Sequence, residues 1–359
     1  MNNSVVDTSE ALANYLKAHV TYCEPYGNGH INNTFLVIAD KRYILQGINT
    51  SIFTRPDELM ENIIGVTEHI RNKAAEDKER ATLVIIPTLD GQNFFCDSHG
   101  KYWRMFEFTE RTVTFEAVEK AEDFYNCAVA FGQFQRALAD YPAHTLHETI
   151  INFHNTPIRY ENLMRAAEND VCGRLAEVTE ELKFAKARRE FCSILENAHA
   201  CGDLPLRVTH NDTKLNNILF DEKTSKPVCV IDLDTVMPGY SVNDFGDSIR
   251  FGANTANEAS TDYSNVKLDL ELFEAYTKGF LEGCDNALTE TEIKLLPIGA
   301  IMMTLECGMR FLTDYLEGDV YFRIHRPKQN LERARNQFAL VADMEKKMDE
   351  MNEIVQKYM

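Results

Sequence analysis

The sequence predicts an α+β protein of two lobes, a β-rich N-terminal lobe at residues 1–106 and a mainly α-helical C-terminal lobe at residues 113–359. Short β-prone runs between turn residues dominate the first part, and apolar residues at helical spacing dominate the second. With 359 residues, the chain also exceeds the roughly 250–300 residues at which a single hydrophobic core stops growing. No low-complexity linker separates the two parts, so we expect a short hinge at residues 107–112.

The N-terminal part opens with a helix and continues with strands. Asp7 and Glu10 have the spacing of a capping box, which predicts a helix that ends near Ala18. Three β-prone runs joined by polar turns predict an antiparallel meander at residues 20–26, 34–39 and 43–46. Pro56 suits the first turn of a helix and is followed by apolar residues at helical spacing. Further strands are predicted at residues 82–86, 94–97 and 102–106.

Helices are predicted for most of the C-terminal part, at residues 117–139, 158–170, 177–200, 266–282, 289–316 and 329–357. The exception lies near the centre of the chain. Two β-prone runs at residues 217–220 and 228–231, separated by the turn-like segment DEKTSKP, predict a β-hairpin. The residues with the strongest chemical pattern gather around this hairpin.

The bulk composition excludes several classes of function. A formal net charge of −19 is at odds with the basic surface that nucleic-acid binding needs, so nucleic acid is not expected as a partner. The N-terminus has no signal-peptide pattern, and no apolar run approaches the roughly 18 residues of a membrane span. The 9 cysteines form no CxxC pair, which is typical of reduced thiols. We therefore expect a cytoplasmic protein that does not bind membranes, and the sequence indicates no obligate protein partner.

One constellation has the residue types that phosphoryl transfer requires. His210, Asp212 and Asn217 form an H-x-D-x4-N pattern, and Asp232 and Asp234 follow the predicted hairpin. Phosphoryl transfer needs a carboxylate beside the acceptor hydroxyl, and oxygen ligands for the metal ion that neutralises the phosphates. The hairpin explains the spacing, because it carries the chain out and back before Asp232. The pattern indicates a Mg²⁺-dependent phosphotransferase that uses ATP as co-substrate.

His210 and two aspartates further along the chain also have other interpretations. His210 could be a buried, hydrogen-bonded histidine with no part in catalysis. The triplet Asp244-Phe245-Gly246 matches the metal-binding triplet of protein kinases, but it lies beyond the end of the predicted hairpin, so we do not assign it to the metal. Asp247 is expected either to anchor the catalytic loop or to cap the N-terminus of a helix.

Over nearly its whole length the sequence resembles the aminoglycoside phosphotransferase-like kinases, relatives of the protein kinases that include choline, homoserine and various sugar kinases. The resemblance implies a protein-kinase-like fold whose N-terminal lobe binds the nucleotide. It implies that Asp212 is the catalytic base and that His210 supports the loop of Asp212. Asn217 and Asp232 would be the Mg²⁺ ligands, and Asp234 would be a further metal ligand or a support beside them.

Two features depart from the family pattern. Gln46 ends the third predicted strand, where the family often has a lysine that contacts the α- and β-phosphates and pairs with an acid such as Glu58 or Glu61. The segment Gly27-Asn28-Gly29 contains only two glycines, which is a weak signal for a phosphate-binding loop. We expect Gln46 and this segment to bind the nucleotide, with metal ions and backbone groups providing most of the hold.

A closer resemblance is to the N-acetylhexosamine 1-kinases of bacterial amino-sugar salvage. The matching stretches lie in both lobes and read YGNGHINNTF, YILQGIN, THNDTKLNNILF, VIDLDTVMPGY and ECGMRFLTDYLEGDVYF. The resemblance implies ATP-dependent phosphorylation of the anomeric hydroxyl of N-acetylglucosamine and N-acetylgalactosamine, which gives the sugar 1-phosphate.

Candidate sugar contacts come from one polar stripe and one loop. Glu306, Arg310 and Asp314 recur every four residues on a predicted apolar helix, and Tyr321 follows, so the stripe could face a sugar. Arg310, Tyr321 and His30 are the expected contacts, because guanidinium and aromatic groups suit sugar hydroxyls. The same spacing also fits a ladder of ion pairs with no ligand.

Two other functions stay open. The chain could phosphorylate another hydroxyl acceptor, such as choline, homoserine or an aminoglycoside. A choline site would need an aromatic box, and the single tryptophan, Trp103, lies in the predicted N-terminal lobe. The acidity of the chain would suit an aminoglycoside, whereas the quoted stretches favour an amino sugar. A non-catalytic relative that only binds nucleotide is the other interpretation, because of Gln46.

Overall fold

A computed structural model describes residues 6–27, 31–74, 78, 80–115, 117, 118 and 120–359. The architecture is α+β, as predicted, with an antiparallel sheet in the N-terminal part and helices in the C-terminal part. The chain forms two compact units that alternate along the sequence. Unit 1 consists of Met1–Val113, Thr145–Ile150 and Leu219–Val236, and unit 2 consists of Thr114–His144, Ile151–Ile218 and Met237–Met359. The sequence-based division used one hinge instead, at residues 107–112.

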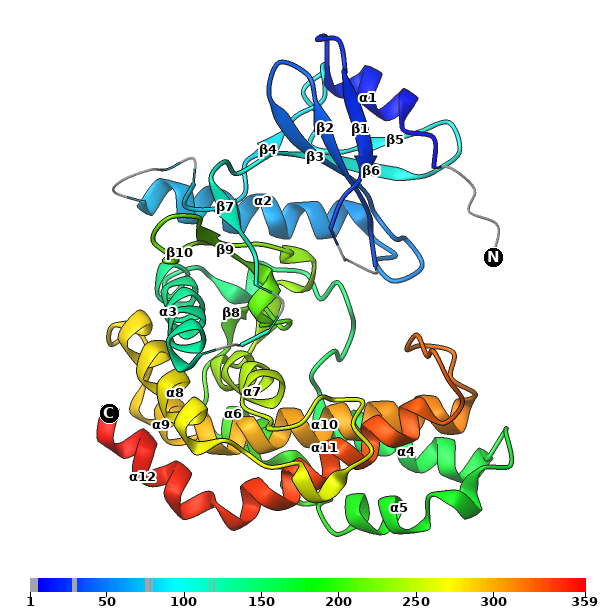
Figure 1. The fold of residues 1–359 in the computed structure, drawn as a ribbon, viewed down its shortest axis with the longest axis vertical. Helices are drawn as coiled ribbons and strands as arrows, with labels where there is room; N and C mark the ends of the chain where they lie inside the picture. Colours follow the sequence, from blue (N-terminus) through cyan, green and yellow to red (C-terminus); the bar gives the residue numbers. More distant parts are fainter. Residues whose placement is uncertain (1–5, 28–30, 75–77, 79, 116, 119) are drawn as a thin grey trace. The chain divides into compact units, whose positions relative to one another are not determined.

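Unit 1 is built on an antiparallel sheet (Figure 1). The strand order is β1-β2-β3-β6-β4, and β5 also pairs with β6. The strands are β1 (Tyr22–Pro25), β2 (Asn33–Ile38), β3 (Arg42–Gly47), β4 (Ile85–Ile86), β5 (Phe95–Cys96) and β6 (Tyr102–Glu107). The predicted meander of the first three strands is confirmed. The pairing of β3 with β6 was not predicted, and it places Gln46 opposite Arg104.

Helix α1 (Ser9–Tyr15) packs its buried residues Ala11 and Tyr15 against the apolar face of this sheet. The helix is shorter than expected, and the predicted capping box does not form. Thr8 is the N-cap residue, and Glu10 instead accepts hydrogen bonds from Ser98. The spacing of Asp7 and Glu10 was therefore correct for a helix start but wrong about which groups pair.

Helix α2 (Pro56–Lys73) connects the first segment of unit 1, which contains the sheet, to its two later segments, 145–150 and 219–236. Its start at Pro56 and its helical spacing were predicted, and both are confirmed. The buried side chain of Asn62 donates hydrogen bonds to the carbonyls of His147 (2.8 Å) and Val236 (3.0 Å), and its Oδ1 accepts from the His147 amide. One amide side chain thus ties α2 to both segments of unit 1 that return from later in the sequence.

The predicted hairpin is present as β9 (Ile218–Asp221) and β10 (Pro227–Val230). A short strand, β7 (Thr112–Val113), adds to it and pairs with β9, which gives a three-stranded sheet in the order β10-β9-β7. The chain leaves β10 and reaches Asp232 in a left-handed conformation, with φ of 59°. Asp232 is the N-cap residue of the 3-10 turn η5 (Leu233–Thr235).

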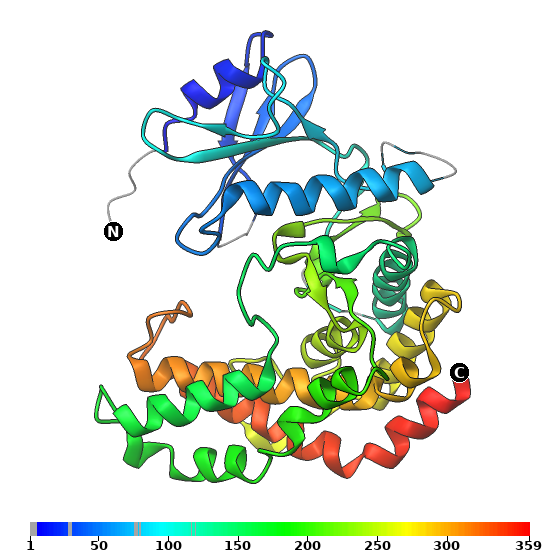
Figure 2. The same ribbon diagram turned by 180° about the vertical axis from the view of Figure 1, so that it is seen from behind.

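Unit 2 is a bundle of helices around α10 (Figure 2). Its helices are α3 (Ala121–Ala137), α4 (Thr156–Asn169), α5 (Thr179–Lys186), α6 (Ile194–Ala200), α7 (Ser241–Gly252), α8 (Leu270–Cys284), α9 (Glu290–Lys294), α10 (Leu296–Glu317), α11 (Gln329–Lys346) and α12 (Met348–Tyr358). A two-stranded ribbon of β8 (Arg207–Thr209) and β11 (Met237–Gly239) lies at the start of the loop that contains His210 and Asp212. Short 3-10 turns are η1 (Ala143–Thr145), η2 (Leu175–Glu177), η3 (Phe191–Ser193), η4 (Leu215–Asn217) and η6 (Tyr263–Asn265).

Close backbone contacts hold α7 against α10. A Cβ added at Gly246 would meet the carbonyl oxygen of Gly299, and one added at Gly299 would meet the carbonyl of Val242. The two glycines therefore allow the helices to approach until their backbones touch. Among the described residues, no helix is both long and apolar enough to cross a membrane.

Candidate active site

The predicted catalytic loop follows β8 in unit 2 and is built on a buried histidine. The ring of His210 is fully buried and packs edge-on against Phe131 and Phe134 of α3, at 5.5 and 5.9 Å between centroids. Its Nδ1 accepts a hydrogen bond from the Asp212 amide at 3.3 Å. Asn211, between them, has a positive φ of 65°, which is a costly conformation that asparagine tolerates better than most residues. The loop therefore turns sharply at Asn211, and the buried ring of His210 supports it.

Two aspartates of α7 fix the backbone of this loop. Asp244 is fully buried and accepts hydrogen bonds from the amides of His210 and Asn211, both at 2.8 Å, and from Gln135 of α3 at 2.8 Å. Burial raises the pKa of the Asp244 carboxyl above its ordinary value, and the charge of His210 and these hydrogen bonds only partly offset that effect. Asp244 is therefore an internal anchor, consistent with leaving it out of the predicted metal site.

Asp247 anchors the next residue of the loop, which confirms the first of its two predicted roles. Its Oδ2 accepts a hydrogen bond from the Thr213 amide at 3.1 Å, and Arg250 donates two hydrogen bonds to its Oδ1. Burial favours the neutral form, but the Arg250 and Lys214 charges hold the pKa of the Asp247 carboxyl below its ordinary range. Asp247 lies inside α7, whose N-cap residue is Tyr240.

The Asp212 carboxylate has a partner on each oxygen. Lys214 Nζ lies 2.6 Å from Oδ1, and Asn217 Nδ2 donates to Oδ2 at 3.1 Å and to the Asp212 carbonyl at 2.8 Å. Burial lowers the pKa of the Lys214 ammonium, but the Asp212 carboxylate raises it by more, so the net shift is upward. Lys214 is therefore a charged ammonium held beside the predicted base. All three residues belong to unit 2.

Two predicted Mg²⁺ ligands have oxygens suited to the ion. Because the Asn217 amide nitrogen is committed to Asp212, its Oδ1 is turned away and accepts no hydrogen bond from any described residue. Asp232, in unit 1, is exposed. Carboxylate and amide oxygens are the ligands that Mg²⁺ uses, often one or two beside water and phosphate oxygens. Among the described residues, no three His, Cys, Asp or Glu side chains gather into a metal cluster.

Asp234 differs from Asp232 in its surroundings. It is buried in unit 1, where Arg104 Nη1 lies 2.6 Å from its Oδ1 and Asn32 Nδ2 donates to its Oδ2 at 2.6 Å. Both carboxylate oxygens therefore have protein partners already. Gln46 belongs to the same network, because its Oε1 accepts hydrogen bonds from Arg104 Nε and Nη2 at 3.0 and 2.8 Å.

The remaining predicted nucleotide contacts are partly described. Gly27 is exposed and has a positive φ of 77°, and a Cβ added there would meet no atom within 4 Å. Asn28, Gly29 and His30 lie outside the described residues. The two acids expected beside the missing lysine have other partners, since Glu58 pairs with Arg55 at 2.8 Å and Glu61 with His147 at 2.8 Å.

The polar stripe of α10 is mostly internal, so the expectation that the whole stripe could face a sugar was wrong. Glu306 is fully buried and binds His154 Nδ1 and Thr156 Oγ1, both at 2.7 Å. Asp314 is buried as well and accepts hydrogen bonds from the amides of the segment 320–322. Glu306 and Asp314 point into the protein because each carboxylate accepts hydrogen bonds from donors of a neighbouring segment.

Arg310 is the member of the stripe that keeps partial exposure, and aromatic rings surround it. Its guanidinium lies 5.0 Å from the ring centroid of Phe153, 5.9 Å from that of Tyr321 and 5.5 Å from that of Phe322. No described residue forms a hydrogen bond or ion pair with it. Burial and the charge of Arg310 lower the pKa of the nearby Arg159, whose guanidinium donates two hydrogen bonds to the Phe153 carbonyl.

Sequence reasoning missed three residues that contact the predicted site residues of their own unit. Lys214 stands two positions after Asp212, and the D-x-K spacing was the available signal. Asp244 was considered only as a metal ligand, although its place three residues before Asp247 puts both on one face of a helix. Arg104 had a fainter signal, a single charge within the apolar run YWRMF.

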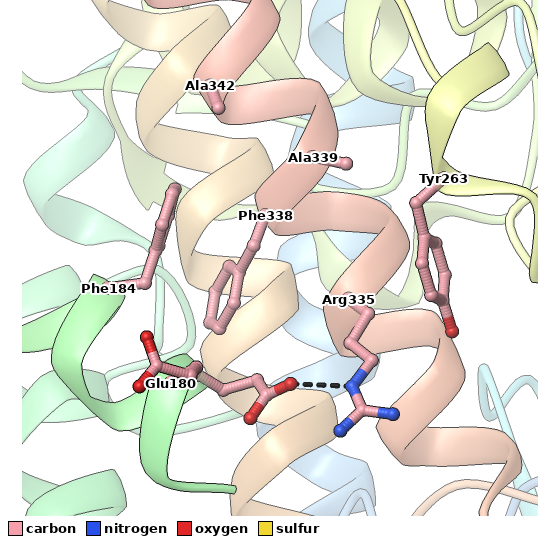
Figure 3. Close-up of a pocket in the computed structure, with 8 residues that line it drawn as sticks. Glu180, Phe184, Tyr263, Arg335, Phe338, Ala339 and Ala342 are labelled. Carbon is pink, nitrogen blue, oxygen red and sulfur yellow. Dashed lines mark hydrogen bonds and ion pairs between the residues drawn. The ribbon is translucent and has the colours of Figure 1, made fainter.

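A separate groove of about 450 Å³ lies in unit 2 between α5, α11 and Tyr263 (Figure 3). Phe184 and Phe338 stack in it at 4.9 Å between centroids, and Arg335 pairs with Glu181 at 2.5 Å. None of the predicted site residues lines this groove. The chemical pattern of the sequence therefore points to the loop of Asp212 and not to this groove.

Several solved structures have this fold. An aminoglycoside phosphotransferase from Alicyclobacillus acidocaldarius has a TM-score of 0.66 at 13% identity, covering 99% of this chain and 98% of that one. A microcompartment-associated aminopropanol kinase has a TM-score of 0.62 at 14% identity, with 96% and 97% covered. A choline kinase from Cryptosporidium parvum has a TM-score of 0.55 at 14% identity, with 99% and 94% covered. At such identities the likeness shows the fold alone.

The sequence itself also matches a family model. That model describes the phosphotransferase enzyme family and matches residues 23–276, which is more than half of the chain. The matched region contains the loop of Asp212, both α7 anchors and the hairpin that leads to Asp232. The chain belongs to the phosphotransferase enzyme family.

Proposed function

We propose that this chain transfers the γ-phosphoryl group of ATP to a hydroxyl of a small-molecule acceptor, with Asp212 as the base. One observation carries the proposal, namely a partly exposed carboxylate whose oxygens contact Lys214 and Asn217, on a loop whose amides are bound by two α7 aspartates. Family membership supports the reaction class. Phosphoryl transfer depends mainly on such fixed positioning and charge.

The residues divide the work as follows. Asp212 orients the acceptor hydroxyl and accepts its proton late, as the hydroxyl oxygen bonds to phosphorus. Asn217 and Asp232 are the proposed Mg²⁺ ligands, with Asp234 beside them, and the ion when bound neutralises charge on the phosphates. The segment Gly27-Asn28-Gly29 and Gln46 are the proposed contacts to the nucleotide. His210 supports the loop through its ring.

Lys214 joins this set on geometric grounds. An acceptor hydroxyl bound to the Asp212 carboxylate lies roughly 3 Å from it, and the attacked phosphorus lies roughly 3–3.5 Å further on. An ammonium that is 2.6 Å from the same carboxylate is therefore within a few side-chain rotations of the transferring phosphoryl group. We propose that Lys214 stabilises the charge of that group during transfer.

For the acceptor, we propose the anomeric hydroxyl of N-acetylhexosamines, N-acetylglucosamine and N-acetylgalactosamine, which gives the 1-phosphate. The stretches THNDTKLNNILF and ECGMRFLTDYLEGDVYF support this choice by resemblance. The surroundings of Arg310 support it physically. A guanidinium among three aromatic rings offers donors to hydroxyl and acetyl oxygens and apolar faces to a sugar ring. Tyr321 and His30 are the proposed further contacts.

The charges of unit 2 near Arg310 disfavour a cationic acceptor. The carboxylates of Glu306 and Asp314 are buried and committed to protein donors, so neither offers a counter-ion. Arg310 and Arg159 would repel an ammonium group placed among the same rings. Choline, moreover, would need an aromatic box. The three rings around Arg310 already hold its guanidinium, and Trp103 is buried in unit 1.

The second candidate is a cationic hydroxyl acceptor, an aminoglycoside or an amino alcohol. The names of the similar solved structures suggest it, and the net charge of −19 would attract such a cation from solution. A non-catalytic chain that only binds nucleotide is the third possibility, suggested by Gln46. A preference for neutral or for cationic acceptors therefore distinguishes the first two candidates, and any turnover excludes the non-catalytic one.

The test is acceptor-dependent release of ADP, measured with matched acceptors. N-acetylglucosamine and glucosamine differ only in whether the amine is acylated, so the pair tests the positive charge and the acetyl group together. Choline, 1-amino-2-propanol and an aminoglycoside complete the panel. We expect N-acetylglucosamine and N-acetylgalactosamine to give much the highest kcat/KM. Preference for glucosamine or the amino alcohols would overturn the acceptor assignment, and no release with any acceptor would overturn the reaction.

A further inference from the structure

Gln46 does not stand alone at the position where the family resemblance expects a lysine. Its Oε1 accepts two hydrogen bonds from Arg104, its cross-strand neighbour on β6, and its Nε2 donates to Thr34 Oγ1 at 3.1 Å. The Oε1 atom therefore holds the guanidinium in one orientation, and one of the two hydrogens of Nε2 binds Thr34 and fixes the amide. A positive charge is present at this place in unit 1, but it comes from the neighbouring strand.

The held guanidinium also forms an ion pair with Asp234. Arg104 Nη1 lies 2.6 Å from Asp234 Oδ1, and the two side chains are 1% and 4% exposed. Asn32 completes the arrangement, because it donates to Asp234 Oδ2 at 2.6 Å and accepts from the Asn49 amide at 3.0 Å. Removing one partner of a buried ion pair strongly destabilises a protein, because the other charge stays buried without compensation. The position of Asp234 is consequently fixed by the sheet.

Asp234 is connected to Asp232 through a short and strained piece of backbone. Asp232 has φ of 59° and is the N-cap residue of η5, the turn that contains Asp234. A non-glycine residue keeps such a conformation only when the surrounding structure imposes it. Thr149 adds to the restraint by donating from Oγ1 to the Asp234 carbonyl at 3.1 Å. Fixing Asp234 therefore restricts the directions that the exposed Asp232 carboxylate can take.

We propose that Arg104 and Asp234 are positioning residues, a buried ion pair that orients Asp232 for Mg²⁺. Arg104, from β6, takes over the fixed positive charge that the family resemblance places at position 46. The inference rests on the proposed function, because it takes Asp232 as a metal ligand. Glu58 and Glu61, the acids expected to pair with a lysine at position 46, support it by having other partners.

The first experiment compares metal binding and thermal stability in one variant. Asp234→Asn keeps the volume but removes the charge, and we expect the affinity for Mn²⁺·ADP, measured calorimetrically without acceptor, to fall by about 10–100-fold. Glu292→Gln is the matched control, because it breaks a buried pair with Arg207 in unit 2. Both variants should lower Tm, and only Asp234→Asn should weaken Mn²⁺·ADP. A weaker fold with unchanged Mn²⁺·ADP affinity would overturn the positioning role.

The second experiment tests whether position 46 simply lacks a lysine. If it did, Gln46→Lys would supply the missing contact, and the KM for ATP would fall. The proposal predicts the opposite, because a second cation beside Arg104 would disrupt the Arg104–Asp234 pair and weaken Mn²⁺·ADP binding. Gln46→Met serves as its uncharged control and should weaken binding less than Gln46→Lys. Tighter binding of Mn²⁺·ADP by Gln46→Lys would refute the proposal that Arg104 supplies the positive charge expected at position 46.

The two experiments separate this inference from the function beneath it. If the unaltered protein failed to bind Mn²⁺·ADP, the proposed function would be refuted and this inference with it. If the unaltered protein bound Mn²⁺·ADP and Asp234→Asn bound it equally well, the metal site would stand and only the role of the buried pair would be refuted.

Discussion

Lys214 Nζ lies 2.6 Å from Asp212 Oδ1, so the predicted base and a charged ammonium form one ion pair on the loop that follows β8. The ammonium keeps the carboxylate in place before substrates arrive. The pair therefore gives the loop both of the properties that phosphoryl transfer needs, a fixed proton acceptor and a positive charge.

The first prediction concerns that ammonium. Lys214→Met should lower kcat by roughly 10²–10³-fold, the loss typical when one charge-stabilising donor is removed, with little change in either KM. Lys214→Arg keeps the charge at a different reach and should recover part of the rate. Steady-state kinetics at saturating Mg²⁺ measure both. A Lys214→Met enzyme with unaltered kcat would show that the ammonium only tethers Asp212.

Asp244 gives a prediction about stability. Asp244→Asn replaces one carboxylate oxygen by an NH₂ group, which cannot accept a hydrogen bond, so at least one of the donors from His210, Asn211 and Gln135 loses its acceptor. Leaving a buried donor unsatisfied costs about 1–3 kcal/mol, so the free energy of unfolding should fall by about that amount. Urea denaturation measures it, and kcat should fall as well because the loop loses its anchor. A variant as stable as the unaltered protein would contradict the anchoring role.

The pH dependence of stability should contain a contribution from Glu306. Burial opposes its charge, but His154 and the nearby arginines hold the pKa of this carboxyl below its ordinary value. The unfolded chain then binds more protons than the folded one as the pH falls below about 4.5, so stability is lost on acidification. Glu306→Gln should be less stable near neutral pH and should lose stability less steeply between about pH 5 and pH 3. Parallel curves for the two proteins, from urea denaturation across this range, would contradict the assignment.

The acceptor proposal predicts a separation of the two Michaelis constants. Arg310→Ala removes the donors proposed to bind the sugar, so the KM for N-acetylglucosamine should rise by roughly 10–100-fold, as expected for a charge-assisted hydrogen bond. The KM for ATP should not change. Arg323→Ala, an exposed arginine of the following segment, is the control and should leave both constants unaltered. An equal rise of both constants in Arg310→Ala would point to a structural role instead.

The sequence predicted those elements whose signals are local. The strands of the meander, the Pro56 start of α2 and the β9–β10 hairpin all follow from turn residues and from alternating or helical spacing. Helix α7 was missed although Val242, Phe245 and Ile249 recur at helical spacing. Every residue from Ser241 to Arg250 is buried, so its polar residues bind other parts of the protein and not solvent, which the sequence alone does not reveal.

The candidate site divides in a similar way. Asp212 and Asn217 could be predicted, because one loop supplies both and their spacing is fixed. The partners of Gln46 could not, because the pairing of β3 with β6 decides that Arg104 is its neighbour. Whether Glu306 faces a ligand or His154 depends likewise on packing between α10 and the segment before α4. Contacts between distant segments leave little trace in the local sequence.

The most direct test of the central claim is the steady-state rate of the Asp212→Asn enzyme with N-acetylglucosamine, compared with that of the unaltered enzyme. Asparagine keeps the shape of the side chain but cannot accept the proton. We predict that kcat falls by roughly 10²–10⁴-fold, with little change in the KM for the sugar. The product of the unaltered enzyme should be the 1-phosphate, recognised by coupling of phosphorus to H1 in the NMR spectrum. Full activity in Asp212→Asn would contradict the assignment of the base, and coupling to the H6 protons would contradict that of the acceptor hydroxyl.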